Sequence, residues 1–138
     1  MPQQAPQTLN WVKARAECSL LNAFEELAEG AKEDAEEMTR LLGEQSRLVF
    51  STYRPSKRRF SVARVDDPIT NISSSVDFEL EANEIVVYHM SNSGNEVVFR
   101  VGATFNNEGQ CRLKITGLDE ELEPWQIRRK ALEKFFFS

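Results

Sequence analysis

Two kinds of hydrophobic periodicity divide the chain. From about Leu9 to Leu42, apolar residues recur at steps of three and four, which is typical of one face of a helix. This pattern predicts one long acidic helix of about 50 Å, with Gly30 as the point of a bend or break and Gly43 as its end. The predicted apolar stripe contains Trp11, Ala14, Cys18, Leu21, Phe24, Ala28, Ala31, Ala35, Met38 and Leu42.

After Gly43 the period changes from 3.6 to 2. In the clearest segment, Val76, Phe78 and Leu80 alternate with acidic residues, so one side of the segment is apolar and the other is polar. About six such segments follow one another, separated by short runs of turn-forming residues. Short connections between neighbouring strands force antiparallel pairing, so the sequence predicts a meander sheet.

The chain ends with a second helical pattern over residues 121–137, acidic at its start and basic toward its end. Because helices flank the strands instead of alternating with them, we expect an α+β fold with two layers. The alternative architecture is a closed barrel with a terminal helix. The predicted buried face of this last helix consists of Trp125, Ile127, Ala131, Leu132, Phe135 and Phe136.

Composition indicates a single domain. The chain has 138 residues, 41% hydrophobic and 28% charged, so we expect one domain over residues 9–138 preceded by a frayed end over residues 1–8. The net charge of -5 makes nucleic acid an unlikely partner for the surface as a whole. No apolar run approaches the ~20 residues that span a bilayer, and the first residues lack the features of a secretory signal. We therefore expect a cytoplasmic protein without a membrane partner.

The two cysteines stand far apart in the sequence. Cys18 falls in the predicted long helix and Cys111 in the last predicted strand, both in apolar-facing positions. We expect two buried free thiols, as in other cytosolic proteins, with a disulfide between helix and sheet as the competing interpretation.

Candidate chemistry is sparse. His89 is the only histidine, so a multi-histidine metal site is excluded, and Cys18 or Cys111 with His89 would be the only possible thiol–imidazole pair. The favoured interpretation of His89 is a hydrogen-bonded residue on a sheet face. We expect no catalytic residues, no metal and no cofactor, and the sequence favours a non-enzymatic protein.

Charge is concentrated in two places. Seven acidic residues between Glu25 and Glu37 predict a solvated helix face or an acidic surface that docks a basic partner or the chain's own basic hairpin. That basic hairpin consists of Arg54, Lys57, Arg58 and Arg59.

These patterns support three functional hypotheses. The first is an interaction or scaffold domain that forms a dimer through the long helix, at Leu20, Phe24, Leu27 and Met38. The reason is that an apolar stripe of that length exceeds what the chain's own sheet can cover. A separate protein partner is also compatible with this hypothesis. The second is a small-ligand binder or enzyme with a pocket between a curved sheet and the helix. The third is nucleic-acid contact through the basic hairpin.

Overall fold

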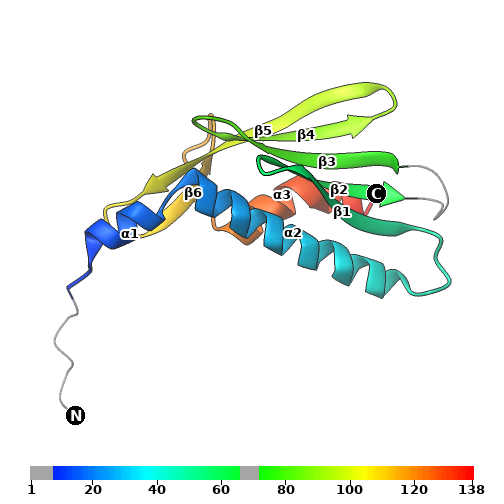
Figure 1. Cartoon of the computed structure of the whole chain (residues 1–138), viewed down its shortest axis with the longest axis horizontal. Coiled ribbons are helices and arrows are strands. Elements are labelled where there is room, and N and C mark those ends of the chain that lie inside the picture. Colours follow the sequence, from blue (N-terminus) through cyan, green and yellow to red (C-terminus); the bar gives the residue numbers. More distant parts are fainter. Residues whose placement is uncertain (1–7, 66–71) are drawn as a thin grey trace, which may run out of the picture.

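The fold is a six-stranded sheet covered on one face by helices (Figure 1). The computed structural model describes residues 8–65 and 72–138. Most of the expected frayed end, and the loop after the second strand, lie outside these residues. The elements in chain order are α1 (Trp11–Glu17), α2 (Leu20–Leu42), β1 (Val49–Ser56), β2 (Arg59–Val65), β3 (Ile72–Leu80), β4 (Ile85–Ser91), β5 (Gly94–Phe105), β6 (Cys111–Ile115) and α3 (Pro124–Phe136).

The sheet is an antiparallel meander in the order β1-β2-β3-β4-β5-β6, which confirms the predicted α+β fold. It is open, with β1 at one edge and β6 at the other, so the barrel alternative is wrong. Both edges are partly protected: the Thr39 hydroxyl exchanges hydrogen bonds of 3.0 and 3.1 Å with the backbone of Phe50 in β1. At the other edge, Leu113 in β6 pairs with the backbone of Leu122. These contacts satisfy some of the backbone hydrogen-bonding groups that an edge strand leaves unpaired.

α2 and α3 lie side by side over the same face of the sheet (Figure 1). Between α2 and the strands, the ring of Phe24 packs against Phe60, which stacks on Phe78 with 4.5 Å between ring centroids. Between β1 and α3, the ring of Phe50 makes edge-on contacts with Phe135 and Phe136. Side chains with period 2 on the strands and period 3.6 on the helices thus meet in one core, where burial of apolar surface stabilises both layers.

The N-terminal helical region is two helices, not one. The break falls at Cys18 and Ser19, where Ser19 has an extended backbone and its side chain accepts a hydrogen bond from the backbone N–H of Asn22, which caps α2. α1 contains no buried residue, and Trp11 is exposed, contrary to its place in the predicted stripe. Leu21 is also exposed, whereas the stripe from Phe24 to Met38 is buried as predicted.

Gly30 does not bend or break the helix. It lies inside α2 and is buried, and a side chain at this position would collide with the guanidinium group of Arg128 from α3. Arg128 reaches this point to pair with Asp34, with 2.7 Å between Nε and Oδ2. Glycine at position 30 is therefore explained by the close approach of α3, not by local backbone geometry.

The expectation of two buried free thiols is wrong. Cys18 and Cys111 form a disulfide that joins the end of α1 to the start of β6, and Cys111 lies at the surface. Apart from this bond, the described residues of α1 make few contacts with the sheet, and Leu9, just before α1, lies close to Gly109. The disulfide is therefore the principal attachment of α1.

We predict that replacing both cysteines by serine lowers the free energy of unfolding. The bond closes a loop with a sequence separation of 93 residues, and loop-closure entropy gives an upper expectation of about 4 kcal/mol. Urea unfolding of the oxidised protein, of the reduced protein and of the double variant measures the effect. Reductant should destabilise the natural sequence and leave the double variant unchanged. Two titratable thiols in unfolded, unreduced protein would contradict the disulfide.

Candidate interaction surface

The structure uses the basic hairpin largely for internal contacts. Arg54 forms an ion pair with Glu25 of α2, with Nη1 donating to Oε2 over 2.9 Å. Its guanidinium also lies 5.5 Å from the ring centroid of Phe24 and donates to the backbone carbonyl of Lys57. The acidic run of α2 therefore contacts the basic hairpin at one pair, Glu25 and Arg54.

The two remaining arginines of the hairpin bind neighbouring strands. Arg58 donates to the backbone carbonyl of Leu80 over 2.9 Å. Arg59 pairs with Asp77 and Glu79 of β3, with 2.8 and 3.3 Å between the charged atoms. Asp77 is 5% exposed, so Arg59 compensates a carboxylate that would otherwise be buried without a cation. Lys57 is the one hairpin cation without a side-chain contact among the described residues, and nucleic-acid contact here stays a prediction.

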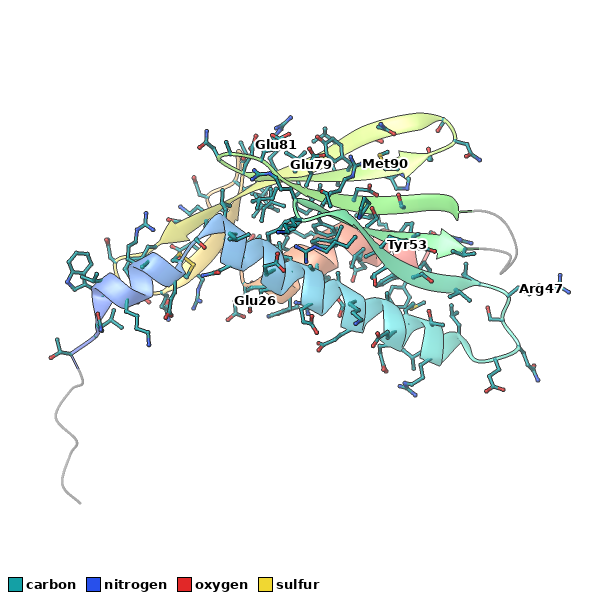
Figure 2. The ribbon with its side chains drawn as sticks, viewed as in Figure 1. Glu26, Arg47, Tyr53, Glu79, Glu81 and Met90 are labelled. Atoms are coloured by element: carbon teal, nitrogen blue, oxygen red, sulfur yellow. A yellow bond between two sulfur atoms is a disulfide. The ribbon has the colours of Figure 1, made fainter. Side chains whose placement is uncertain are left out.

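The other arginines near this region of the sequence are distant from the hairpin. Figure 2 shows Arg47 at the right-hand end of the molecule, far from Glu79 and Glu81, and Glu79 pairs with Arg59 of the hairpin. Arg64 lies opposite Phe50 in the register of β1 with β2, at the other end of β2 from Arg59. The cations that stand close together in the sequence thus divide between the two ends of the sheet.

All four residues predicted for self-association lie in or against the chain's own core. Phe24 and Leu27 are fully buried, and Leu20 packs against the core at its margin. The sheet covers the stripe of α2 along its length, so the premise that the stripe exceeds its own sheet applies only to α1. Met38 is 8% exposed and belongs to the core, but it also lines a groove on the outer surface.

This outer groove, which we call the helix groove, lies between α2 and α3 on the side away from the sheet. Its volume is about 330 Å³, and its apolar lining consists of Met38, Leu41, Trp125, Leu132, Phe136 and Phe137. Leu41, Trp125 and Phe137 are 63%, 49% and 72% exposed. Large apolar side chains gathered at one exposed surface commonly mark an interaction site.

Trp125 was predicted to lie on the buried face of the last helix, and that prediction is wrong. Helical spacing explains its position, because Trp125, Leu132 and Phe136 follow one line along α3, whereas Ile127, Ala131 and Phe135 follow the line toward the sheet. The indole N–H donates to the Glu123 carboxylate over 3.0 Å. The angular offset of Trp125 from Ile127 could have identified this exposed line from sequence.

Charged pairs surround the helix groove. Asp34 pairs with Arg128 across it, Glu37 pairs with Arg40 on α2, and Arg129 pairs with Glu133 on α3. The hydrogen bond from Arg40 lowers the pKa of the Glu37 carboxyl group. These pairs leave the floor of the groove apolar and its rim charged.

The described residues do not assemble a reactive site from the candidates seen in the sequence. Both cysteines are in the disulfide, so no thiol is available to His89. The His89 ring lies edge-on to Phe135, with 6.3 Å between centroids, and makes no hydrogen bond. In residues 8–65 and 72–138, no group of three histidine, cysteine or acidic residues is arranged to hold a metal ion. Among the described helices, none has both the length and the apolarity needed to span a bilayer.

Comparison with known proteins gives no relative: no family model matches the chain, and no curated protein or solved structure shows significant similarity to it.

We predict that Glu25→Gln lowers the free energy of unfolding at pH 7 by less than about 1 kcal/mol, because the pair with Arg54 is half exposed. The hydrogen bond from Arg54 lowers the pKa of the Glu25 carboxyl group below its unfolded value. A group with a lowered pKa contributes stability above its unfolded pKa and loses it as pH falls through the folded pKa. The difference between the natural sequence and Glu25→Gln should therefore vanish in the acid range.

Urea unfolding at pH 7 and at pH 3 measures this difference. Glu26→Gln is the matched control, because Figure 2 shows Glu26 on the side of α2 away from the sheet and it has no ion-pair partner among the described residues. An equal loss of stability in both variants would contradict a specific role for the Glu25 pair.

Proposed function

We propose that this protein is a non-enzymatic interaction domain that forms a dimer, and that the helix groove is where a second copy docks. The observation that supports the proposal most strongly is the exposure of Leu41, Trp125 and Phe137 around one apolar groove. A two-fold interface places the same patch of both copies in contact, so these side chains would be buried against their counterparts. Aromatic residues in such a central patch supply much of the binding free energy.

Charge distribution supports a second copy as the occupant. α2 contains seven acidic and two basic residues, whereas α3 contains four basic and one acidic residue. A two-fold axis that runs along the groove sets α2 of each copy against α3 of the other. The acidic helix of one copy would then face the basic helix of its partner, an arrangement that favours association and fixes its register.

The proposal keeps self-association on the long helix but moves it to the outer surface. The predicted contact residues Phe24 and Leu27 serve the core of each copy, and Met38 is the predicted residue that also belongs to the groove. The exposed residues beside it, Leu41 on α2 and Trp125 on α3, take the place of the buried ones. A cytoplasmic location, expected from the sequence, is not part of this proposal, because disulfides are rare in the cytosol of most organisms.

We predict that Leu41→Asp weakens dimerisation by more than about tenfold, because it sets an unpaired carboxylate against an apolar surface. Sedimentation equilibrium over a range of micromolar concentrations measures the dissociation constant. Leu118→Asp is the matched control, since Leu118 is 50% exposed and lies outside the groove. Association should also weaken as salt rises, because charges of opposite sign meet across the interface.

Two results would contradict the proposal. The first is a natural sequence that remains a strict monomer at high micromolar concentration. The second is a dimer that Leu41→Asp leaves intact while Leu118→Asp disrupts it.

A further inference from the structure

A second groove lies on the other side of α3, between that helix and strands β3, β4 and β5. Its volume is about 580 Å³, and we call it the lysine groove because Lys130 and Lys134 line it from α3. His89 of β4 and Glu96 and Val97 of β5 line the opposite side. Figure 1 shows the β4–β5 hairpin at the top of the view, with β1, β2 and β3 between it and α2.

The two lysines are separated by one helical turn and so project on the same side of α3. Neither has a hydrogen bond or an ion pair with any residue in the part of the chain that the structure describes. Arg64 also lines the groove, but it has an interaction of its own, so only the two lysines are counted as available cations. Glu96 is the one acidic side chain among the described lining residues, which also include Ser138.

This arrangement differs from that of the basic hairpin. Arg54, Arg58 and Arg59 are bound to Glu25, to a backbone carbonyl and to Asp77 and Glu79, so their charge is largely compensated within the chain. In a protein with a net charge of -5, two uncompensated cations on one side of a groove give this site a local positive charge. Lysine ammonium groups donate hydrogen bonds to phosphate oxygens in many proteins.

The floor of the lysine groove is apolar. Val76 of β3, Val98 of β5 and Phe135 of α3 line it, and Val98 is 46% exposed. A ligand that consists of an anionic group alone would leave this surface uncovered. A ligand with an apolar body attached to the anionic group would cover both parts, as small-molecule sites commonly require.

We propose that the lysine groove binds an organic phosphate monoester, with the phosphate on Lys130 and Lys134 and the apolar body over Val98 and Phe135. A phosphate monoester carries nearly two negative charges at neutral pH, which matches two cations. Glu96 restricts the ligand, because its carboxylate repels a second anionic group on the body. The chemistry is shared by soluble phosphate esters and by the headgroup of phosphatidic acid.

The single histidine of the chain makes the test direct. His89 lines the groove, so its ring proton signals in the NMR spectrum belong to one residue and report on the occupancy of this site. Phenyl phosphate is titrated at constant pH and ionic strength, with inorganic phosphate and phenol in parallel. We expect a saturable shift of the His89 signals with phenyl phosphate at a lower concentration than with either fragment.

Two variants with the same change in net charge separate the site from general electrostatics. Lys130→Gln with Lys134→Gln should weaken binding of phenyl phosphate by about fivefold or more, since two exposed charge contacts are lost. Lys32→Gln with Lys57→Gln removes two exposed lysines outside the groove and should leave binding unchanged. Glu96→Gln should strengthen binding, because it removes a like charge near the phosphate.

The proposal is overturned if the His89 signals shift without saturation. It is also overturned if the double substitution of Lys130 and Lys134 weakens binding no more than that of Lys32 and Lys57. Equal affinity for inorganic phosphate and phenyl phosphate would overturn the assignment of an apolar body. Sedimentation with vesicles of phosphatidic acid, compared with vesicles of phosphatidylcholine, then distinguishes the sources. Specific sedimentation assigns the lipid headgroup, and its absence, with a saturable shift by phenyl phosphate, assigns a soluble ester. None of these results depends on whether the protein is a dimer.

Discussion

The architecture depends on covering one apolar face of an open sheet. Each strand turns alternate side chains to that face, and a sheet left bare there would expose Phe60 and Phe78 to water. α2 and α3 provide the cover from opposite ends of the chain, so neither helix can be removed without exposing the core. Because both helices commit their inner sides to the sheet, the surfaces left for function are the outer sides of these helices, the grooves along α3 and the face of the sheet that the helices do not cover.

The disulfide and the helix break determine the position of the N-terminal region. Ser19 caps α2 and ends the path of α1, while the bond from Cys18 to Cys111 ties this corner to the edge strand β6. α1 buries no side chain of its own, so its orientation is determined by a covalent bond and not by packing. Arg128 contributes a different kind of constraint, because its side chain lies against Gly30, pairs with Asp34 and so ties α3 to α2 beside the helix groove.

Sequence periodicity predicted the elements well and their surroundings less well. The alternation around Val76, Phe78 and Leu80 identified the strands and the buried side of the sheet, because a hydrophobic period of two residues is compatible with few structures other than a β-strand. The continuous apolar spacing from Trp11 to Phe24 concealed the cap at Ser19, so the helix break was not predicted. The disulfide, the approach of Arg128 to Gly30 and the two grooves depend on residues far apart in sequence. Composition and spacing do not specify such contacts, and the basic hairpin appeared to be a patch because its ion-pair partners lie on other elements.

The most direct test of the central claim is native-state hydrogen exchange at residue resolution. If α2 is a structural layer required by the sheet, its amides between Phe24 and Met38 should exchange only through the same global unfolding that exposes β3 and β4, while the amides of α1 exchange at much lower free energy. Exchange of the α2 amides at a free energy well below that of β3 and β4 would show that the sheet persists without its cover. That result would contradict the account.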